Sequence, residues 1–129
     1  MSSNALTPQS ARAFADRWIS AWNRKDVEAV LADFSDDVMF TSPRAKSVVG
    51  SPRVVGKSQL REYWTRSLSR IQSLRFTLDH VLCDGDRLAI LYIAEIDGKC
   101  IRAVEFLNFG PDGLIREGEA MHGVELEPA

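Results

Sequence analysis

Leu88-Ala-Ile-Leu-Tyr-Ile-Ala-Glu-Ile96 is followed by the pair Asp97-Gly98 and then by Ile101-Arg-Ala-Val-Glu-Phe-Leu-Asn-Phe109. Both stretches are rich in β-branched and aromatic residues, and a short Asp-Gly connection between such stretches is typical of a β-hairpin. The first stretch is apolar at nearly every position, whereas a sheet covered on one face alternates apolar and polar residues. We therefore expect two antiparallel strands that are covered on both faces.

Turn residues also mark the strands on either side of this hairpin. Asp84-Gly85 precedes it, and Pro111-Asp112-Gly113 follows it. These short polar connections favour antiparallel neighbours. The sequence predicts four strands over about 74–83, 87–97, 99–109 and 114–124, arranged as a meander.

The first half of the chain has a helical period. Thr7 followed by Pro8 predicts a helix start, because the hydroxyl can cap free N–H groups and proline fits the first turn. One stripe of apolar residues then recurs to position 22: Ala11, Phe14, Ala15, Trp18, Ile19 and Trp22. We expect a helix over about 8–23, a second short helix from an Asp26 cap through Phe34, and a third over about 58–71.

A short strand and a loop connect the second and third helices. Val38, Phe40 and Ser42 fall on one side of the predicted strand, which Pro43 should end. Residues 43–56 hold two prolines, two glycines and the bases Arg44, Lys46 and Arg53. We expect an exposed connection here, either simply solvated or forming the lip of a pocket.

Composition narrows the function classes. The chain has 129 residues with 45% hydrophobic and 26% charged, which indicates one ordinary globular domain over 1–129. A net charge of -2 disfavours nucleic acid and membrane surfaces as partners.

No apolar run approaches the roughly 20 residues of a membrane helix, and residues 1–9 do not resemble a secretory signal, so we expect a cytoplasmic protein. Cys83 and Cys100 lack metal-ligand spacing, and we expect no metal and no cofactor.

The predicted second apolar face of the sheet needs a cover, because three helices already occupy the first. The simplest candidate is a second copy of the chain, which would make a homodimer through Leu91, Ile93, Val104 and Phe106. The alternative is a more enclosed monomer core.

The element order and a set of residues along the whole chain together form a known pattern. Those residues are Trp22-Asn23, Asp26-Val27, Ala29, Phe34-Ser35-Asp36-Asp37-Val38, Phe40, Ser42-Pro43, Gly56, Phe109-Gly110 and Asp112-Gly113. The chain resembles the nuclear transport factor 2 (NTF2)-like superfamily, in particular its ketosteroid isomerase and SnoaL-like polyketide cyclase branches. The resemblance implies an α+β cone, with three N-terminal helices packed on a curved antiparallel sheet that encloses a pocket, and dimerisation through the convex face.

The resemblance also assigns positions to the isomerase machinery, which is a general-base aspartate and an oxyanion hole of tyrosine and neutral aspartic acid. The base falls on Ser42, the tyrosine on Trp18 and the aspartic acid on Glu105. A serine without an adjacent base cannot remove a carbon-bound proton at neutral pH, and an indole donates a hydrogen bond but no proton. Isomerisation by the family's mechanism is therefore not expected.

Glu105 keeps its carboxyl group and is the first candidate catalytic residue. The strand period turns it inward beside apolar neighbours, which should raise its pKa. The same alternation on the last strand turns Arg116, Gly118, Ala120 and His122 inward, so that His122 or Arg116 could meet Glu105. The alternatives are an ion pair of Glu105 with Arg102 or Arg116 at the sheet surface, and a solvent-facing His122 near the chain end.

Large rings are too numerous to serve only as core filler, so some should line a cavity for a small apolar organic ligand. We expect its walls to include Phe14, Trp18, Trp22, Phe34, Phe40, Ser42, Tyr63, Trp64, Tyr92, Ala103, Arg116 and Ala120. Two functions stay open. One is cofactor-free proton transfer of the isomerase, cyclase or dehydratase type, with Glu105 and His122 as the polar pair. The other is a non-catalytic dimeric domain that binds a ligand or a protein segment.

Overall fold

The computed structural model describes residues 5–127. Residues 1–4, which belong to the segment interpreted as lacking a secretory signal, and residues 128–129 lie outside this range. Along the chain the elements are α1 (Pro8–Asn23), α2 (Val27–Leu31), β1 (Phe34–Thr41), α3 (Ala45–Val49), β2 (Arg53–Val55), α4 (Lys57–Ser69), β3 (Leu74–Asp84), β4 (Arg87–Ile96), β5 (Lys99–Phe109) and β6 (Ile115–Glu125). The expected α+β class is confirmed.

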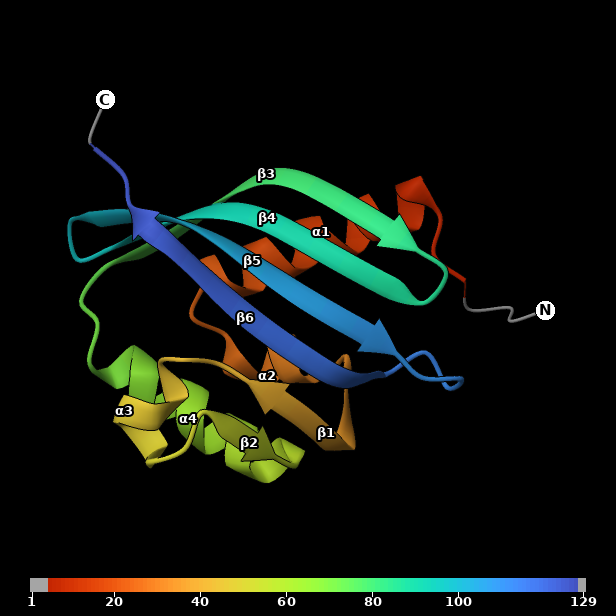
Figure 1. Cartoon of the computed structure of the whole chain (residues 1–129), viewed down its shortest axis with the longest axis horizontal. Helices are drawn as coiled ribbons and strands as arrows, with labels where there is room; N and C mark the ends of the chain where they lie inside the picture. The colour runs from red at the N-terminus through yellow and green to blue at the C-terminus, as the bar shows by residue number, and fades with distance from the viewer. Residues whose placement is uncertain (1–4, 128–129) are drawn as a thin grey trace.

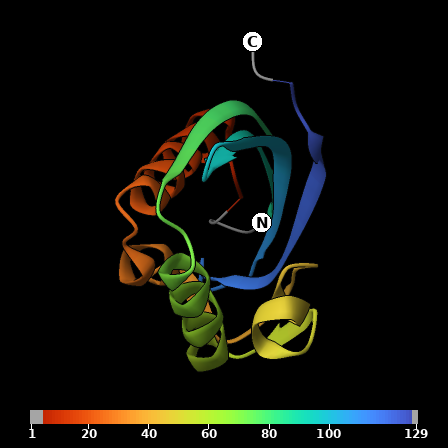
Figure 2. The same cartoon turned by 90° about the vertical axis from the view of Figure 1, so that its left-hand side faces the viewer.

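One sheet of six strands has the order β2-β1-β6-β5-β4-β3. Strands β3 to β6 form the predicted antiparallel meander, with Leu91 opposite Val104 in the central pair. Strand β1 runs parallel to β6 and antiparallel to β2. The sheet curves around α1 and α4 without closing into a barrel (Figures 1 and 2).

Helix α1 begins where the sequence predicts. The Thr7 hydroxyl accepts a hydrogen bond from the Ser10 backbone N–H at 3.0 Å, and the Ser10 hydroxyl accepts one from the Thr7 N–H at 2.9 Å. This reciprocal pair satisfies two N–H groups that have no partner inside the helix. At the other end, the Asn23 side chain donates to the Phe76 carbonyl and accepts from its N–H, at 2.9 and 2.7 Å. These two bonds fix α1 against strand β3.

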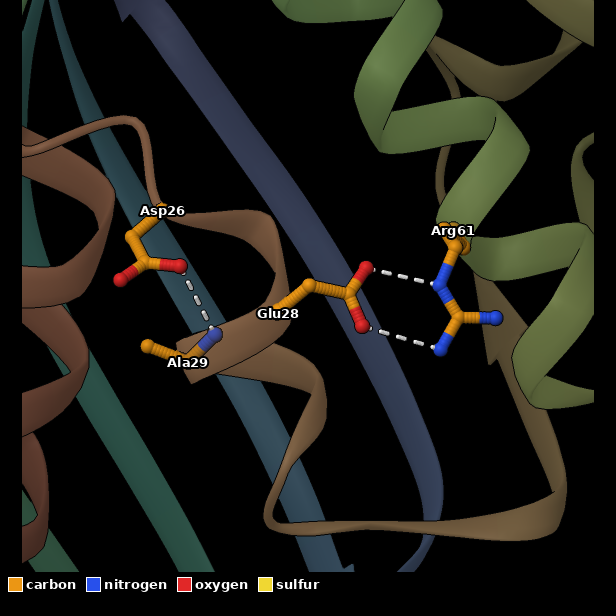
Figure 3. A network of polar contacts seen from close by, with 4 residues as sticks. All are labelled: Asp26, Glu28, Ala29 and Arg61. Atoms are coloured by element: carbon orange, nitrogen blue, oxygen red, sulfur yellow. Dashed lines mark hydrogen bonds and ion pairs between the residues drawn. The ribbon is translucent and has the colours of Figure 1, made fainter.

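Helix α2 is joined to α4 by charged side chains (Figure 3). Asp26 caps α2 as expected, accepting a hydrogen bond from the Ala29 N–H at 3.1 Å. Arg61 on α4 donates two parallel hydrogen bonds to the Glu28 carboxylate, at 2.8 and 3.1 Å. Such a paired geometry adds direction to an exposed ion pair, and it holds α4, which carries Tyr63 and Trp64, in place.

Two expectations for the middle of the chain are wrong. Phe34 does not end the second helix but begins β1, because it pairs with Ile115 of β6 and the Ile115 N–H bonds to the Asp33 carbonyl. Residues 43–56 are not only a loop, since they form α3 and β2, and Val54 is buried opposite Phe40. The described residues therefore contain four helices, not three. The first difference arises from pairing with β6, a strand far along the chain, which local patterns do not encode.

The face of the sheet opposite α1 and α4 is open in the described part of the chain (Figures 1 and 2). Leu91, Ile93 and Val104 on this face are half-buried, whereas Phe106 is 43% exposed. Residues 5–127 therefore do not form the more enclosed monomer core that was the alternative. Within residues 5–127, no helix is both long enough and apolar enough to cross a membrane.

Candidate functional site

A cavity of about 100 Å³ lies among α1, α4 and the concave face of the sheet. Ten of the predicted site residues line it, namely Trp18, Trp22, Phe40, Ser42, Tyr63, Trp64, Tyr92, Glu105, Ala120 and His122. Seven further residues complete the lining, namely Arg44, Ser67, Leu68, Ile71, Leu74, Phe76 and Ile96. The walls are thus mostly aromatic and aliphatic, with a small number of polar groups.

Glu105 lies on the concave face of β5 and is 3% exposed. Its neighbours of the same parity, Ala103 and Leu107, are buried beside it, as the period of two predicts. Within the described residues no hydrogen bond or ion pair reaches its carboxyl group. Burial raises the pKa of Glu105 well above its usual value, because a carboxylate loses its hydration there. Arg102 and Arg116 are both exposed, so the expected alternative of a surface ion pair is wrong.

His122 is a diagonal neighbour of Glu105 across two paired strands. Glu105 pairs with Ala120 and Ala103 pairs with His122, which places the two side chains on the same face. The imidazole is half-buried, and its Nδ1 is buried without a partner in the described chain. Burial, assisted by the positive charge of Arg44, lowers the pKa of His122 to about 4. The imidazole is therefore neutral near pH 7, and the alternative of a solvent-facing side chain is wrong.

Ser42, at the position of the family's general base, bonds to a phenol. Its hydroxyl lies 3.0 Å from the Tyr63 hydroxyl, and either oxygen can donate. Burial raises the pKa of Tyr63 above its usual value, so the phenol stays protonated at neutral pH. Ser42 consequently has no neighbouring base that could activate it.

The aromatic wall is built by α1, α4 and the strands facing them. Trp18 meets Tyr92 edge-on at a ring distance of 5.1 Å, and Trp22 meets Trp64 in the same way at 5.0 Å. The Nε1–H groups of Trp18 and Trp22 are buried without a hydrogen-bond partner in the described chain. An unpaired buried donor costs about 1–3 kcal/mol. A ligand oxygen would remove that cost.

Four predicted wall residues are not among the described residues that line this cavity. Phe14 packs on Phe109, Phe34 packs on Trp64, and Ala103 is buried in the core. Arg116 is exposed, and its side-chain carbons lie against Gly110. Arg116 does not face inward because the register between β5 and β6 shifts near residues 108 and 109, and this shift turns Ile115 inward instead.

The seven lining residues that were not predicted had weaker signals. Leu68 and Ile71 share the apolar face of the third predicted helix, and Phe76 alternates along the first long strand. Arg44 stood out only as one of the basic residues of a possible lip. Among residues 5–127, no group of three or more His, Cys, Asp or Glu side chains is placed to hold a metal ion.

Comparison with known proteins assigns the family. Residues 15–118 match the profile of the SnoaL-like domain, so the chain belongs to the SnoaL-like family. The predicted resemblance to the SnoaL-like branch is confirmed. A search of curated proteins found no match.

Solved structures agree with this assignment. A SnoaL-like protein of unknown function from Burkholderia thailandensis is 32% identical, with a TM-score of 0.83 over 93% of this chain and 99% of its own. A candidate ketosteroid isomerase from Kribbella flavida is 21% identical, with a TM-score of 0.73 over 94% and 83%. TerC, co-crystallised with polyporic acid, is 17% identical, with a TM-score of 0.72 over 87% and 91%. The last two show the fold alone.

Proposed function

We propose that the protein binds a small, mostly apolar ring compound through an oxygen atom of that compound, with Glu105 as the polar anchor. The observation that carries the proposal is the set of unpaired polar groups around an apolar cavity. The Trp18 and Trp22 N–H groups lack partners, and no hydrogen bond or ion pair within residues 5–127 reaches the buried Glu105 carboxyl. A carbonyl or hydroxyl oxygen would accept hydrogen bonds from the indoles and from a protonated Glu105.

Cavity size favours a single ring. The volume of about 100 Å³ is somewhat below the roughly 150 Å³ of a protein cavity that accepts benzene. It is also below the roughly 300–1,000 Å³ of pockets for drug-sized ligands. A four-ring steroid would fit only if lining side chains moved, whereas a monocyclic ketone needs small adjustments. TerC, which has the same fold, was crystallised with polyporic acid, so an organic oxygen compound is compatible with this scaffold.

The proposal is tested with cyclohexanone and its hydrocarbon counterpart, methylcyclohexane. All three tryptophans of the chain line the cavity, so their fluorescence reports on binding directly. We expect the ketone to bind more tightly than the hydrocarbon. Trp18→Phe should weaken ketone binding about 2- to 10-fold, the usual value of one neutral hydrogen bond. Hydrocarbon binding by the same variant is the matched control and should change little. Equal losses for both compounds would contradict the polar anchor.

A second candidate function is cofactor-free proton transfer, which the shared face of Glu105 and His122 favours. The His122 imidazole would accept a proton from carbon, while Glu105 donates a hydrogen bond to the enolate oxygen; return of the proton restores both groups. The His122 pKa of about 4 argues against this second function, because such a weak base has little driving force for removing a proton from carbon. Deuterium exchange into cyclohexanone in D₂O that is lost in both Glu105→Gln and His122→Asn would establish this activity.

Turnover of a ketosteroid is not expected. Ser42 replaces the family's base, its hydroxyl is bonded within residues 5–127 only to a protonated phenol, and the cavity is small for four rings. Conversion of a β,γ-unsaturated ketosteroid should equal the rate in buffer, as followed by the absorbance of the conjugated product. Robust turnover that survives Ser42→Ala would show that another residue is the base.

We propose further that the protein works as a homodimer through the open face of the sheet. Phe106 is 43% exposed and Met121 is 52% exposed on that face, and burying such side chains is a common driving force of association. Val104→Asp should yield a monomer in sedimentation at micromolar concentration, because an unpaired charge is costly in an apolar interface. Ile93→Asp should do the same, and Ser58→Asp on the exposed side of α4 is the control. A wild-type monomer would refute the proposal.

The expected cytoplasmic location stays a prediction.

A further inference from the structure

We infer that the ligand of this cavity is an anion, a small ring compound whose ionised oxygen, such as a carboxylate, is held between Arg44 and the buried donors. This inference rests on the proposed function and specifies its ligand. It starts from the balance of charges and hydrogen-bonding groups around the cavity, which is strongly one-sided.

Arg44 supplies a positive charge at the rim. It lines the cavity while its side chain is exposed, just before α3. Within residues 5–127, no ion pair or hydrogen bond engages its guanidinium group. Its charge acts on three lining residues: it adds to the lowering of the His122 pKa that burial causes, and it offsets part of the rise that burial causes in the pKa of Tyr63 and Tyr92. The cation is therefore near the polar part of the cavity and has no carboxylate partner there.

Among the described residues, no negative charge balances Arg44 inside the cavity. Glu105 is the only carboxyl group among the lining residues that the structure describes, and burial favours its protonated form. An ionised Glu105 would need a partner, and none of the described residues supplies one. As far as residues 5–127 define it, the cavity thus combines one free cation with a neutral acid.

Most of the remaining polar atoms are hydrogen-bond donors. The indole N–H groups of Trp18 and Trp22 can only donate. Ser42 and Tyr63 use one hydroxyl hydrogen in the bond between them, so the second hydrogen remains for a ligand. Together with a protonated Glu105 these groups suit an oxygen that accepts several bonds at once. Charge-assisted hydrogen bonds to such an oxygen are roughly twice as strong as neutral ones.

The pH response of binding follows from the groups that face the cavity: Arg44 at the rim, Tyr63 from α4, Tyr92 from β4, Glu105 from β5 and His122 from β6. Both tyrosines have raised pKa values and stay neutral. As pH rises, ionisation of Glu105 removes a donor and adds repulsion, so affinity for an anion falls. As pH drops below about 4, a carboxylic acid ligand takes up its own proton and loses its attraction to Arg44.

Benzoate and benzamide make the decisive pair of probes, because they share a ring and differ in charge. Tryptophan fluorescence, confirmed by calorimetry, gives both affinities at neutral pH. We expect benzoate to bind at least about 10-fold more tightly than benzamide. Arg44→Gln should reduce benzoate affinity about 10-fold and leave benzamide affinity nearly unchanged. Lys46→Gln, which removes an exposed cation two positions away that does not line the cavity, is the matched control.

The possible outcomes separate the two proposals. Equal affinities for benzoate and benzamide, or benzoate affinity that is unaffected by Arg44→Gln, would overturn the anion inference and leave small-molecule binding in place. Failure of benzoate, benzamide and cyclohexanone alike to bind would overturn the proposed function and the inference with it. Equal losses in Arg44→Gln and Lys46→Gln would show only a general field effect, which also overturns the role of Arg44. Thermal unfolding of both variants verifies that they are folded.

Discussion

Glu105→Gln should be more stable than the wild type at neutral pH, and the gap between their free energies of unfolding should widen as pH rises. Burial raises the pKa of Glu105 above its unfolded value of 4.5. Between these two pKa values the folded state holds a proton that the unfolded state has released. The stability that the Glu105 carboxyl contributes to the wild type is fully present below pH 4.5. It is lost as the pH rises toward the pKa that this carboxyl has in the folded protein. Within that window the loss is about 1.4 kcal/mol per pH unit, and glutamine does not titrate.

Urea denaturation of both proteins, at pH values about one unit apart between roughly 5 and 8, measures the difference between their free energies of unfolding. His122 shifts in the opposite direction, so its contribution is lost as pH falls from 6.5 toward about 4. The two effects partly offset one another in the wild type, and the difference between wild type and variant isolates Glu105. Glu119→Gln, on the exposed side of β6, is the control and should follow the wild type. A gap for Glu105→Gln that is constant with pH would show that Glu105 is already ionised in the folded protein. Glu105→Gln should also make ketone binding less dependent on pH than it is in the wild type.

Gly118→Val should destabilise the protein by about 1–3 kcal/mol, the usual cost of overpacking, or prevent folding. A Cβ atom at this position would lie 2.7 and 2.9 Å from two ring carbons of Phe40 and 3.2 Å from a methyl group of Leu107. Phe40 cannot retreat easily, because its ring contacts Trp64 at 5.4 Å. The absent side chain at Gly118 is therefore what lets Phe40 stand between the sheet and the cavity.

A double-mutant cycle tests this contact. Phe40→Leu removes ring atoms that face Gly118, so the double variant should be more stable than the sum of the two single changes predicts. Glu119→Val places the same side chain on the next residue but on the exposed face, and it should cost far less. Denaturation midpoints of the four proteins give the coupling energy. Additive effects would mean that the clash with Phe40 is not the cause of the loss.

The sequence predicts the elements of this fold more fully than it predicts the site. The stripe of α1, the caps at Thr7 and Asp26 and the four meander strands all follow from local patterns, and the structure places them within two residues of the expected ends. The inward direction of Glu105 also follows, because the β5 alternation is unbroken. The inward direction predicted for Arg116 is wrong, because a register shift between β5 and the first residues of β6 changes which residues face inward. No local signal marks that shift.

Local sequence patterns also do not predict which strands pair with β1. Phe34 has the spacing of a helix residue, and only its contact with Ile115, far along the chain, draws it into a strand. Arg44 reaches the cavity rim because β1 and β2 carry the segment between them to the edge of the sheet, and β1 is held there by its pairing with the distant strand β6. Residues whose role depends on contacts distant in sequence are therefore those that the sequence identified least well.

The parallel pairing of β1 with β6 has a consequence for biosynthesis. The β1 segment that carries Phe34, Val38 and Phe40 is made early by the ribosome, yet the strand that pairs with one of its edges supplies residues 115–119, which are made much later. Because long loops close slowly, this contact should form late in folding. Until then the nascent chain exposes an unpaired apolar strand, the kind of surface that chaperones bind and that aggregates when translation stalls.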